Sequence, residues 1–211
     1  MNVKGVATDF LIVNKGIPSN SSLYDASCDG TWLLMKDCHS NRQWNANGIN
    51  TYENSDINTW LNREFFNNLG ETEKKVVKQV KIPYCVGGGS SIINSGANGL
   101  SCRVFLLGMY EVGFTTSDIV GVSIDGAKLS YFESGTGSSA LNKRIAYYNG
   151  SSVAWWSRSI NTDFVNPSSN HAKGINTNGN FIYDYVSHSY GIRPALILPP
   201  TTRIYNGMVI A

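Results

Sequence analysis

The sequence is poor in charge. Asp, Glu, Lys and Arg together make up 15% of the 211 residues, and the formal net charge is +2. The densest group of lysines lies between Lys74 and Lys81, where Glu71 and Glu73 dilute its charge. Proteins that bind the phosphate backbone of nucleic acids carry a basic stripe or patch. Nucleic acid is therefore not expected as a partner, and these lysines are interpreted as the solvated face of a helix.

Long apolar runs are also missing. No segment is long and apolar enough to cross a bilayer, so membrane insertion is not expected. Residues 1–5 show no charged stretch leading into a long apolar run with a small-residue cleavage site, so no secretory signal peptide is visible. We therefore expect the protein to be made in the cytoplasm.

The residue spacings of known metal-binding and catalytic motifs are absent as well. The four cysteines form no C-x-x-C pair, which disfavours a zinc knuckle or a thioredoxin-type site. Their even number permits two disulfides, but a chain of this length does not need them, and free thiols are favoured. The three histidines lack metal-binding spacing, and no nucleophile elbow is present. The sequence predicts no catalytic residue, no metal and no cofactor.

Apolar patterning predicts several elements of secondary structure. Buried strands are expected at residues 10–13, 31–35, 104–107 and 192–198. The strongest helix signal starts at Asn54 or Ser55 and ends near Gly70, and its apolar face comprises Ile57, Trp60, Leu61 and Phe65. A second helix is expected over residues 72–80, and flexible glycine-rich loops over 87–91 and 134–139. Early helices followed by many short strands favour a single α+β domain over residues 1–211 with an irregular antiparallel sheet.

The last third of the chain contains a sharp contrast. Two compact apolar blocks, residues 153–159 and 191–198, flank a polar and asparagine-rich segment from Ile160 to Tyr190. A rigid frame that holds an irregular segment is typical of a displayed binding surface. Within this segment Asn178-Gly179 predicts a hairpin turn, because both residues tolerate positive φ. The turn would join a strand near residues 173–177 to one near 180–185.

The composition of this segment suits recognition. Its aromatic side chains offer contact area at low rotamer cost, and its polar side chains offer adaptable hydrogen bonds. Trp155 and Trp156 face opposite sides of a strand, so one is expected in the core and Trp156 beneath the binding surface. Tyr190, Arg158 and Arg193 are expected to be structural. The predicted contact residues are Trp156, Asn161, Asp163, Phe164, Asn166, Ser168, Asn170, His171, Phe181, Tyr183, Asp184, Tyr185 and His188.

Four blocks carry a family resemblance: residues 52–62, 80–83, 155–159 and 191–196. Together they resemble a bacterial and phage domain family of unassigned function (the DUF6273 type), over about Phe10 to Leu198. The C-terminal part resembles the C-type-lectin-like fold of formylglycine-generating-enzyme-like proteins and of variable proteins of diversity-generating retroelements. The resemblance implies receptor binding on a phage tail (virion) or display on a bacterial cell surface. It also implies a cell-surface protein or glycan as ligand, and a homo-oligomer that acts through avidity.

Retroelement variable proteins change at adenines, typically in AAC codons. With the final C fixed, such codons cannot become Lys, Glu, Gln, Met or Trp. Residues 160–172 and 180–190 contain none of these five types. This pattern predicts a hypervariable surface, although polar loops rich in Asn, Ser and Tyr produce the same pattern on a surface of fixed specificity.

Two rival functions remain open. The first is a formylglycine-generating-like enzyme with altered chemistry, although the cysteine pair of those enzymes lies near the C-terminal end and every cysteine here precedes Arg103. The second is a structural virion or cell-surface module whose segment 160–190 is buried in an oligomer contact. Calcium-dependent sugar binding is not expected, because the loop of Asn166, Pro167 and Ser168 lacks the carboxylate that calcium requires.

Overall fold

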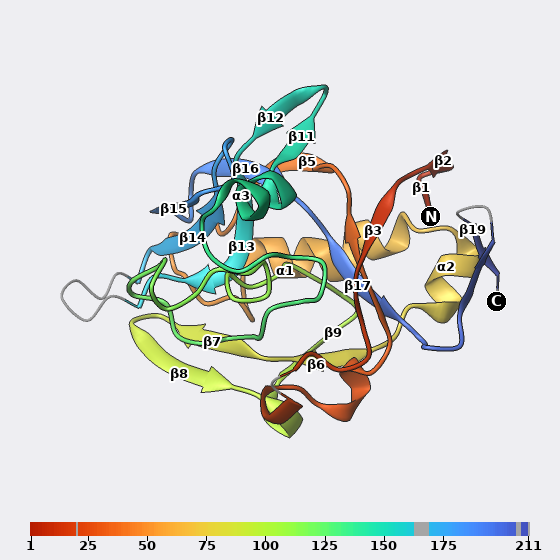
Figure 1. Ribbon diagram of the computed structural model, residues 1–211, viewed down its shortest axis with the longest axis horizontal. Coiled ribbons are helices and arrows are strands. Elements are labelled where there is room, and N and C mark those ends of the chain that lie inside the picture. The colour runs from red at the N-terminus through yellow and green to blue at the C-terminus, as the bar shows by residue number, and fades with distance from the viewer. Residues whose placement is uncertain (20, 163–168, 206–207, 211) are drawn as a thin grey trace.

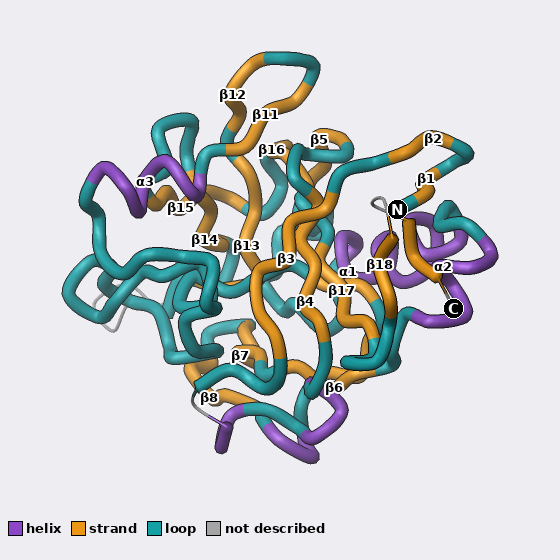
Figure 2. The backbone as a smooth tube through the Cα atoms, turned by 45° about the vertical axis from the view of Figure 1, so that its right-hand side comes forward, coloured by secondary structure: helices purple, strands orange, loops and turns teal. Residues whose placement is uncertain are grey.

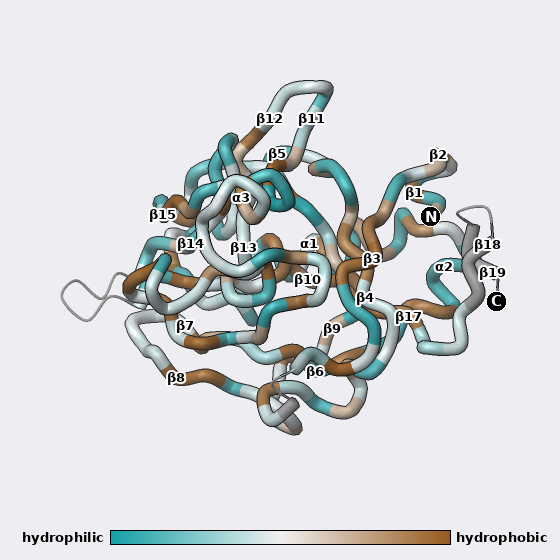
Figure 3. The backbone as a smooth tube through the Cα atoms, viewed as in Figure 1, coloured by the Kyte–Doolittle hydropathy of each residue, from teal (hydrophilic) through white to brown (hydrophobic). Residues whose placement is uncertain are grey.

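A central sheet joins strands from both ends of the chain. The computed structural model describes residues 1–19, 21–162, 169–205 and 208–210. The order of its four-stranded antiparallel sheet is β10-β17-β4-β3, comprising Val104–Phe105, Ala195–Leu198, Thr31–Met35 and Phe10–Lys15. Figures 2 and 3 show β3, β4 and β17 side by side, where hydrophobic segments gather. Burial of these apolar strands builds the core.

A second, five-stranded sheet contains the polar C-terminal segment (Figure 1). Its order is β15-β14-β13-β16-β5, comprising Phe181–Tyr185, His171–Ile175, Trp155–Ile160, Ser189–Ile192 and Ser40–Gln43. The β13–β16 pair is parallel, and the other pairs are antiparallel. All six residues of β13 are buried, so both faces of this middle strand are covered.

Short ribbons and helices surround the two sheets. The ribbons pair β1 with β2, β6 with β9, β7 with β8, β11 with β12 and β18 with β19. Their bounds are β1 (Asn2–Val3), β2 (Val6–Ala7), β6 (Val80–Ile82), β9 (Leu100–Cys102), β7 (Tyr84–Gly87), β8 (Ser90–Asn94), β11 (Ala146–Tyr148), β12 (Ser151–Val153), β18 (Arg203–Tyr205) and β19 (Met208–Ile210). The helices are η1 (Ser21–Leu23), η2 (Ala26–Cys28), α1 (Asp56–Trp60), η3 (Leu61–Phe65, π-helical), α2 (Glu71–Val76), η4 (Gly96–Asn98) and α3 (Ser138–Arg144). The predicted α+β class is confirmed.

The two predicted structural arginines lie inside this scaffold. Arg158 on β13 makes two hydrogen bonds to the Glu111 carboxylate, Nη1 to Oε2 at 2.5 Å and Nη2 to Oε1 at 2.7 Å, and both side chains are fully buried. Its guanidinium also donates to the backbone carbonyls of Pro83, Leu106 and Asp125. Arg193 donates to the Met35 carbonyl. Both arginines therefore tie loops to strands, as predicted.

The predicted first helix is confirmed, and several other predictions need correction. The Ser55 side chain accepts from the Asn58 amide, and the four predicted apolar side chains are buried. The second helix ends at Val76, because Val80 begins β6 and pairs with β9. Of the predicted loop 87–91, only residues 88 and 89 form the turn between β7 and β8, and Ser138 begins helix α3 inside the predicted loop 134–139. Ile12 of the predicted buried strand is 47% exposed.

The predicted hairpin turn is confirmed, and it packs against α3. Gly179 has a φ of +85°, and a Cβ added there would lie 2.2 Å from the Leu141 carbonyl oxygen. Gly150 follows Asn149 in the turn between β11 and β12 and has a φ of +81°, with open space around it. Among the described helices, none has the length and apolar character to span a membrane.

This pair of turns gives a matched test of the packing. We expect Gly179→Ala to lower the free energy of unfolding by about 2 kcal/mol, because it adds a backbone clash to the cost of positive φ. Gly150→Ala carries only the cost of positive φ, about 1 kcal/mol. Urea unfolding of both variants measures the difference. Equal losses would show that the hairpin tip is not held against α3.

Candidate ligand-binding surface

The β14–β15 hairpin presents an aromatic face. Cross-strand register places His171 opposite Tyr185 and Lys173 opposite Tyr183. Since neighbouring side chains in a strand point to opposite faces, these four lie on one side of the hairpin. His188, in the turn after β15, adds its ring 5.7 Å from that of Tyr185. We call His171, Tyr183, Tyr185 and His188 the aromatic patch.

The rings of the aromatic patch contact one another and remain accessible. His171 lies 4.2 Å from the Tyr185 ring and 6.0 Å from the Tyr183 ring, measured between centroids. Tyr183 is 59% exposed and Tyr185 is 47% exposed. Burial is the largest effect on the pKa of His171 and lowers it, which favours a neutral imidazole. The patch therefore offers two phenols and two imidazole rings as contact groups.

Lys173 forms the base of this face. Its side chain is only 3% exposed, and its ammonium nitrogen donates to the Val120 carbonyl at 3.2 Å. The same nitrogen lies 4.8 Å from the Tyr183 ring centroid and 5.8 Å from that of Phe181, within the range of cation–π attraction. Lys173 thus supports the Tyr183 ring from the base of this face. Its position between the two asparagine-rich runs did not predict this role.

The opposite face of β15 fixes the turn that carries His188. Asp184 lies 3.0 Å from His188 Nδ1 and accepts a hydrogen bond from the Tyr190 hydroxyl at 2.5 Å. Burial alone would raise the pKa of Asp184, but hydrogen bonds from His188 and Tyr190 lower it below its usual value. Burial and the Asp184 contact raise the pKa of Tyr190 to about 12. The Asp184 carboxylate therefore fixes the positions of His188 and Tyr190.

A loop distant in sequence anchors the hairpin to the scaffold. The Asn50 backbone amide donates to the Ser169 carbonyl, and its side-chain amide donates to the His171 carbonyl at 2.8 Å. The Asn45 amide donates to the Val186 carbonyl at 2.9 Å. Neither asparagine was predicted as a functional residue, since the spacing of Asn45 and Asn50 carries no signal of contacts more than a hundred residues away.

The predicted contact residues divide into several groups. His171, Tyr183, Tyr185 and His188 come together in the aromatic patch. Asn161, Asn170, Phe181 and Asp184 are half-buried supports; the Asn170 side chain contacts the His171 ring nitrogen at 2.7 Å, and Phe181 packs edge-on against Phe114. Asp163, Phe164, Asn166 and Ser168 lie outside the described residues.

The prediction that Trp156 contacts the ligand is wrong. Both Trp155 and Trp156 are fully buried, because β13 has covered faces on both sides of its sheet. The Trp156 indole donates to the Arg42 carbonyl and packs 4.7 Å from the Tyr190 ring. Trp156 therefore belongs to the core, and half-buried Tyr190 packs against that core as predicted.

The cysteines are structural thiols in this fold. All four are free and buried: Cys28, Cys38, Cys85 and Cys102. Burial raises the pKa of each thiol, to about 12 for Cys28 and Cys38. A raised thiol pKa leaves little of the reactive thiolate at neutral pH. Over the described part of the chain, no three His, Cys, Asp or Glu side chains gather as metal ligands.

Comparison with known proteins identifies a family. The profile of a domain of unknown function, DUF6273, matches residues 29–200, which is more than half of the chain. The chain belongs to the DUF6273 family. The DUF6273 span contains β4 through β17 and therefore the whole aromatic patch. Neither the curated proteins nor the solved structures include one that the chain matches.

Proposed function

We propose that this protein is a non-enzymatic ligand-binding protein whose C-terminal segment presents the contact surface. The observation that carries the proposal is the aromatic patch: Tyr183, Tyr185 and His188 are exposed beside half-buried His171, and the other face of the hairpin is fixed to the scaffold. Rigid aromatic groups lose little conformational entropy on binding. The ligand class is a protein or glycan on a cell surface.

The low charge of the patch supports this ligand class. Lys173 is buried, and Asp184 is held by His188 and Tyr190, so phenols and imidazoles supply the exposed contacts. Tyrosine combines apolar contact area with one hydrogen-bonding group, and it is enriched in binding hot spots. Thiol oxidation of the formylglycine-generating type would need an accessible thiolate, whereas burial raises the pKa of every cysteine here.

A binding screen tests the proposal. Fluorescent wild-type protein and the Tyr183→Ala/Tyr185→Ala variant are applied to a glycan array and to a panel of bacterial cells. We expect wild-type signals that the double variant loses while its unfolding curve stays close to that of the wild type. Signals of equal strength from both proteins would place the binding surface elsewhere.

We further propose that the scaffold is C-type-lectin-like and that segment 160–190 is hypervariable, as in retroelement variable proteins. The amino-acid types of residues 160–172 and 180–190 support this, since all can be reached from AAC codons. We expect the genomic neighbourhood to contain a reverse transcriptase and a near-copy of the segment encoding residues 155–194. Differences between the copies should fall at adenines in codons for patch residues such as Tyr185, and should spare Trp156. A neighbourhood with neither element would leave a binder of fixed specificity.

A further inference from the structure

One tryptophan differs from the other four. The indole N–H groups of Trp32, Trp44, Trp155 and Trp156 each donate to a backbone carbonyl, at 2.9 to 3.3 Å. Trp60 is also buried, but its Nε1 has no acceptor among the described residues. A buried donor without a partner costs about 1–3 kcal/mol. Such a group in a folded protein calls for a physical explanation.

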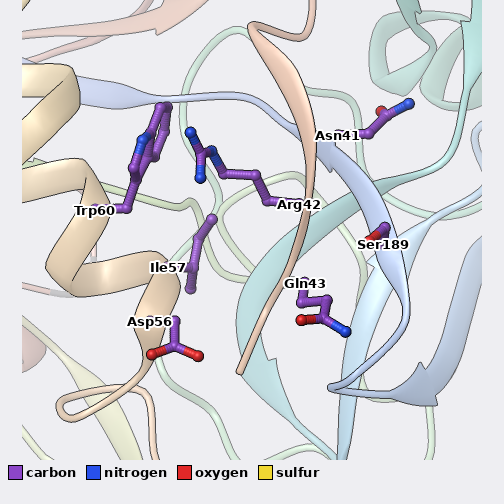
Figure 4. A pocket seen from close by; sticks show the side chains of 7 residues that line it. All are labelled: Asn41, Arg42, Gln43, Asp56, Ile57, Trp60 and Ser189. Carbon is purple, nitrogen blue, oxygen red and sulfur yellow. The ribbon is translucent and has the colours of Figure 1, made fainter. Parts of the chain in front are cut away.

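Trp60 lines a groove between β5, α1 and β16 (Figure 4). The groove has a volume of about 310 Å³ and is lined by Asn41, Arg42, Gln43, Asp56, Ile57, Trp60 and Ser189. Figure 4 shows the guanidinium of Arg42 against the indole of Trp60. Arg42 Cζ lies 4.1 Å from the Trp60 ring centroid, and Arg42 Nε is a second buried N–H for which the described part of the chain supplies no acceptor. Two unsatisfied donors, one of them cationic, thus lie together in one groove.

The charges around Arg42 leave it available for an anion. Its nearest carboxylate is that of Glu64, 3.9 Å from Nη2, and the Glu64 side chain is 69% exposed. That distance is too long for a hydrogen bond, and solvent weakens such a pair. Asp56 also lines the groove, but its Oδ2 already accepts from the Ala46 amide at 2.8 Å. A ligand carboxylate can therefore displace the weak contact between Arg42 and Glu64.

We propose that this groove binds a small hydroxylated carboxylate of the acidic-sugar class. The carboxylate receives the N–H groups of Arg42 and Trp60, because a guanidinium favours a carboxylate acceptor. Both N–H groups are buried in the free protein, so binding requires the Arg42 side chain, which is 41% exposed, to shift on the indole. Ser189, Asn41 and the Oε1 of Gln43, whose Nε2 donates to the Ser187 carbonyl, supply polar groups for the ligand hydroxyls. The groove volume lies at the lower end of the range for small-molecule sites, which suits one sugar ring.

The tyrosines of the aromatic patch lie apart from the groove, although Ser189 of the groove follows His188 of the patch in the chain. The groove lies at the β5 edge of the five-stranded sheet, whereas β15 with Tyr183 and Tyr185 forms the opposite edge. The inference does not rest on the proposed function, and the failure of one leaves the other standing. Alanine variants of Tyr183 and Tyr185 are expected to leave the groove unchanged.

Indole N–H resonances provide a direct test. The five tryptophans give five cross-peaks in a ¹H–¹⁵N spectrum, and loss of one peak in Trp60→Phe assigns the Trp60 signal. We expect sodium glucuronate, added to about 20 mM, to shift the Trp60 peak saturably with a millimolar dissociation constant. Glucose, the neutral counterpart, should leave the peak in place. No saturable shift with glucuronate, or an equal shift with glucose, would overturn the proposal.

Two arginine variants make the test specific. Arg42→Gln removes the charge from the groove and is expected to weaken glucuronate binding at least tenfold. The matched control is Arg103→Gln, because Arg103 also stacks on an aromatic ring of the same helical segment, 5.1 Å from Phe66, but lies outside the groove. The control should bind like the wild type. Unchanged binding by Arg42→Gln, or equal weakening by both variants, would contradict the assigned role of Arg42.

Discussion

Glutamine in place of Glu111 is expected to lower the free energy of unfolding by about 3–5 kcal/mol, because breaking a buried ion pair from one side leaves a charge without its partner. Glu111 and Arg158 are fully buried and joined by two short hydrogen bonds. Glu111 also accepts from the Tyr24 hydroxyl and the Gly108 amide. The loss should appear as a lower urea midpoint with an unchanged slope.

An exposed glutamate provides the control for this substitution. Glu64→Gln removes a carboxylate that is 69% exposed and 3.9 Å from Arg42. Its effect should stay within about 0.5 kcal/mol, as is usual for surface pairs. A loss of less than about 1 kcal/mol for Glu111→Gln would mean that the Arg158 charge does not depend on Glu111.

The second large effect concerns Asp125 and pH. Asp125 is fully buried, and burial raises its pKa from 3.8 to about 6, although the nearby Arg158 charge lowers it. The folded state therefore binds this proton more tightly than the unfolded state does. The contribution is fully present below the unfolded pKa and is lost as pH rises toward about 6. At about 1.4 kcal/mol per pKa unit, the loss amounts to about 3 kcal/mol.

The Asp125→Asn substitution isolates the contribution of the Asp125 proton to the free energy of unfolding. Asparagine resembles the protonated carboxyl and can still accept from the Ser159 hydroxyl, which lies 2.8 Å from Asp125 Oδ2. Unfolding free energies of both proteins are measured from about pH 4 to about pH 7. We expect the variant to gain about 2 kcal/mol relative to the wild type across this range, because part of the contribution is already lost at pH 4. Parallel curves would show that Asp125 keeps an ordinary pKa in the fold.

Local signals in the sequence were enough to predict several elements. The Asn178-Gly179 turn is formed because its backbone geometry favours glycine, and the Ser55 cap is formed because its hydroxyl reaches the nearby Asn58 amide. Both involve residues within a few positions of one another. The second helix was predicted too long because pairing of Val80 with Cys102, across 22 residues, outweighs local helical preference.

The aromatic patch was predictable in part for the same reason. Alternation along β15 indicated that Tyr183 and Tyr185 share one face, and the structure places them so. Burial of Trp156 was not predictable, because strand alternation alone cannot show that both faces of a strand are covered. Anchoring by Asn50 and support by Lys173 depend on contacts distant in sequence.

The most direct measurement is the affinity of single tyrosine variants for the ligand that the binding screen identifies. Tyr185→Ala removes the ring nearest to His171, whereas Tyr147→Ala removes a tyrosine of equal exposure on β11, outside the patch. We predict that calorimetry will show at least about a tenfold higher dissociation constant for Tyr185→Ala, with Tyr147→Ala equal to the wild type. Wild-type affinity in Tyr185→Ala, or an equal loss in both variants, would contradict the account.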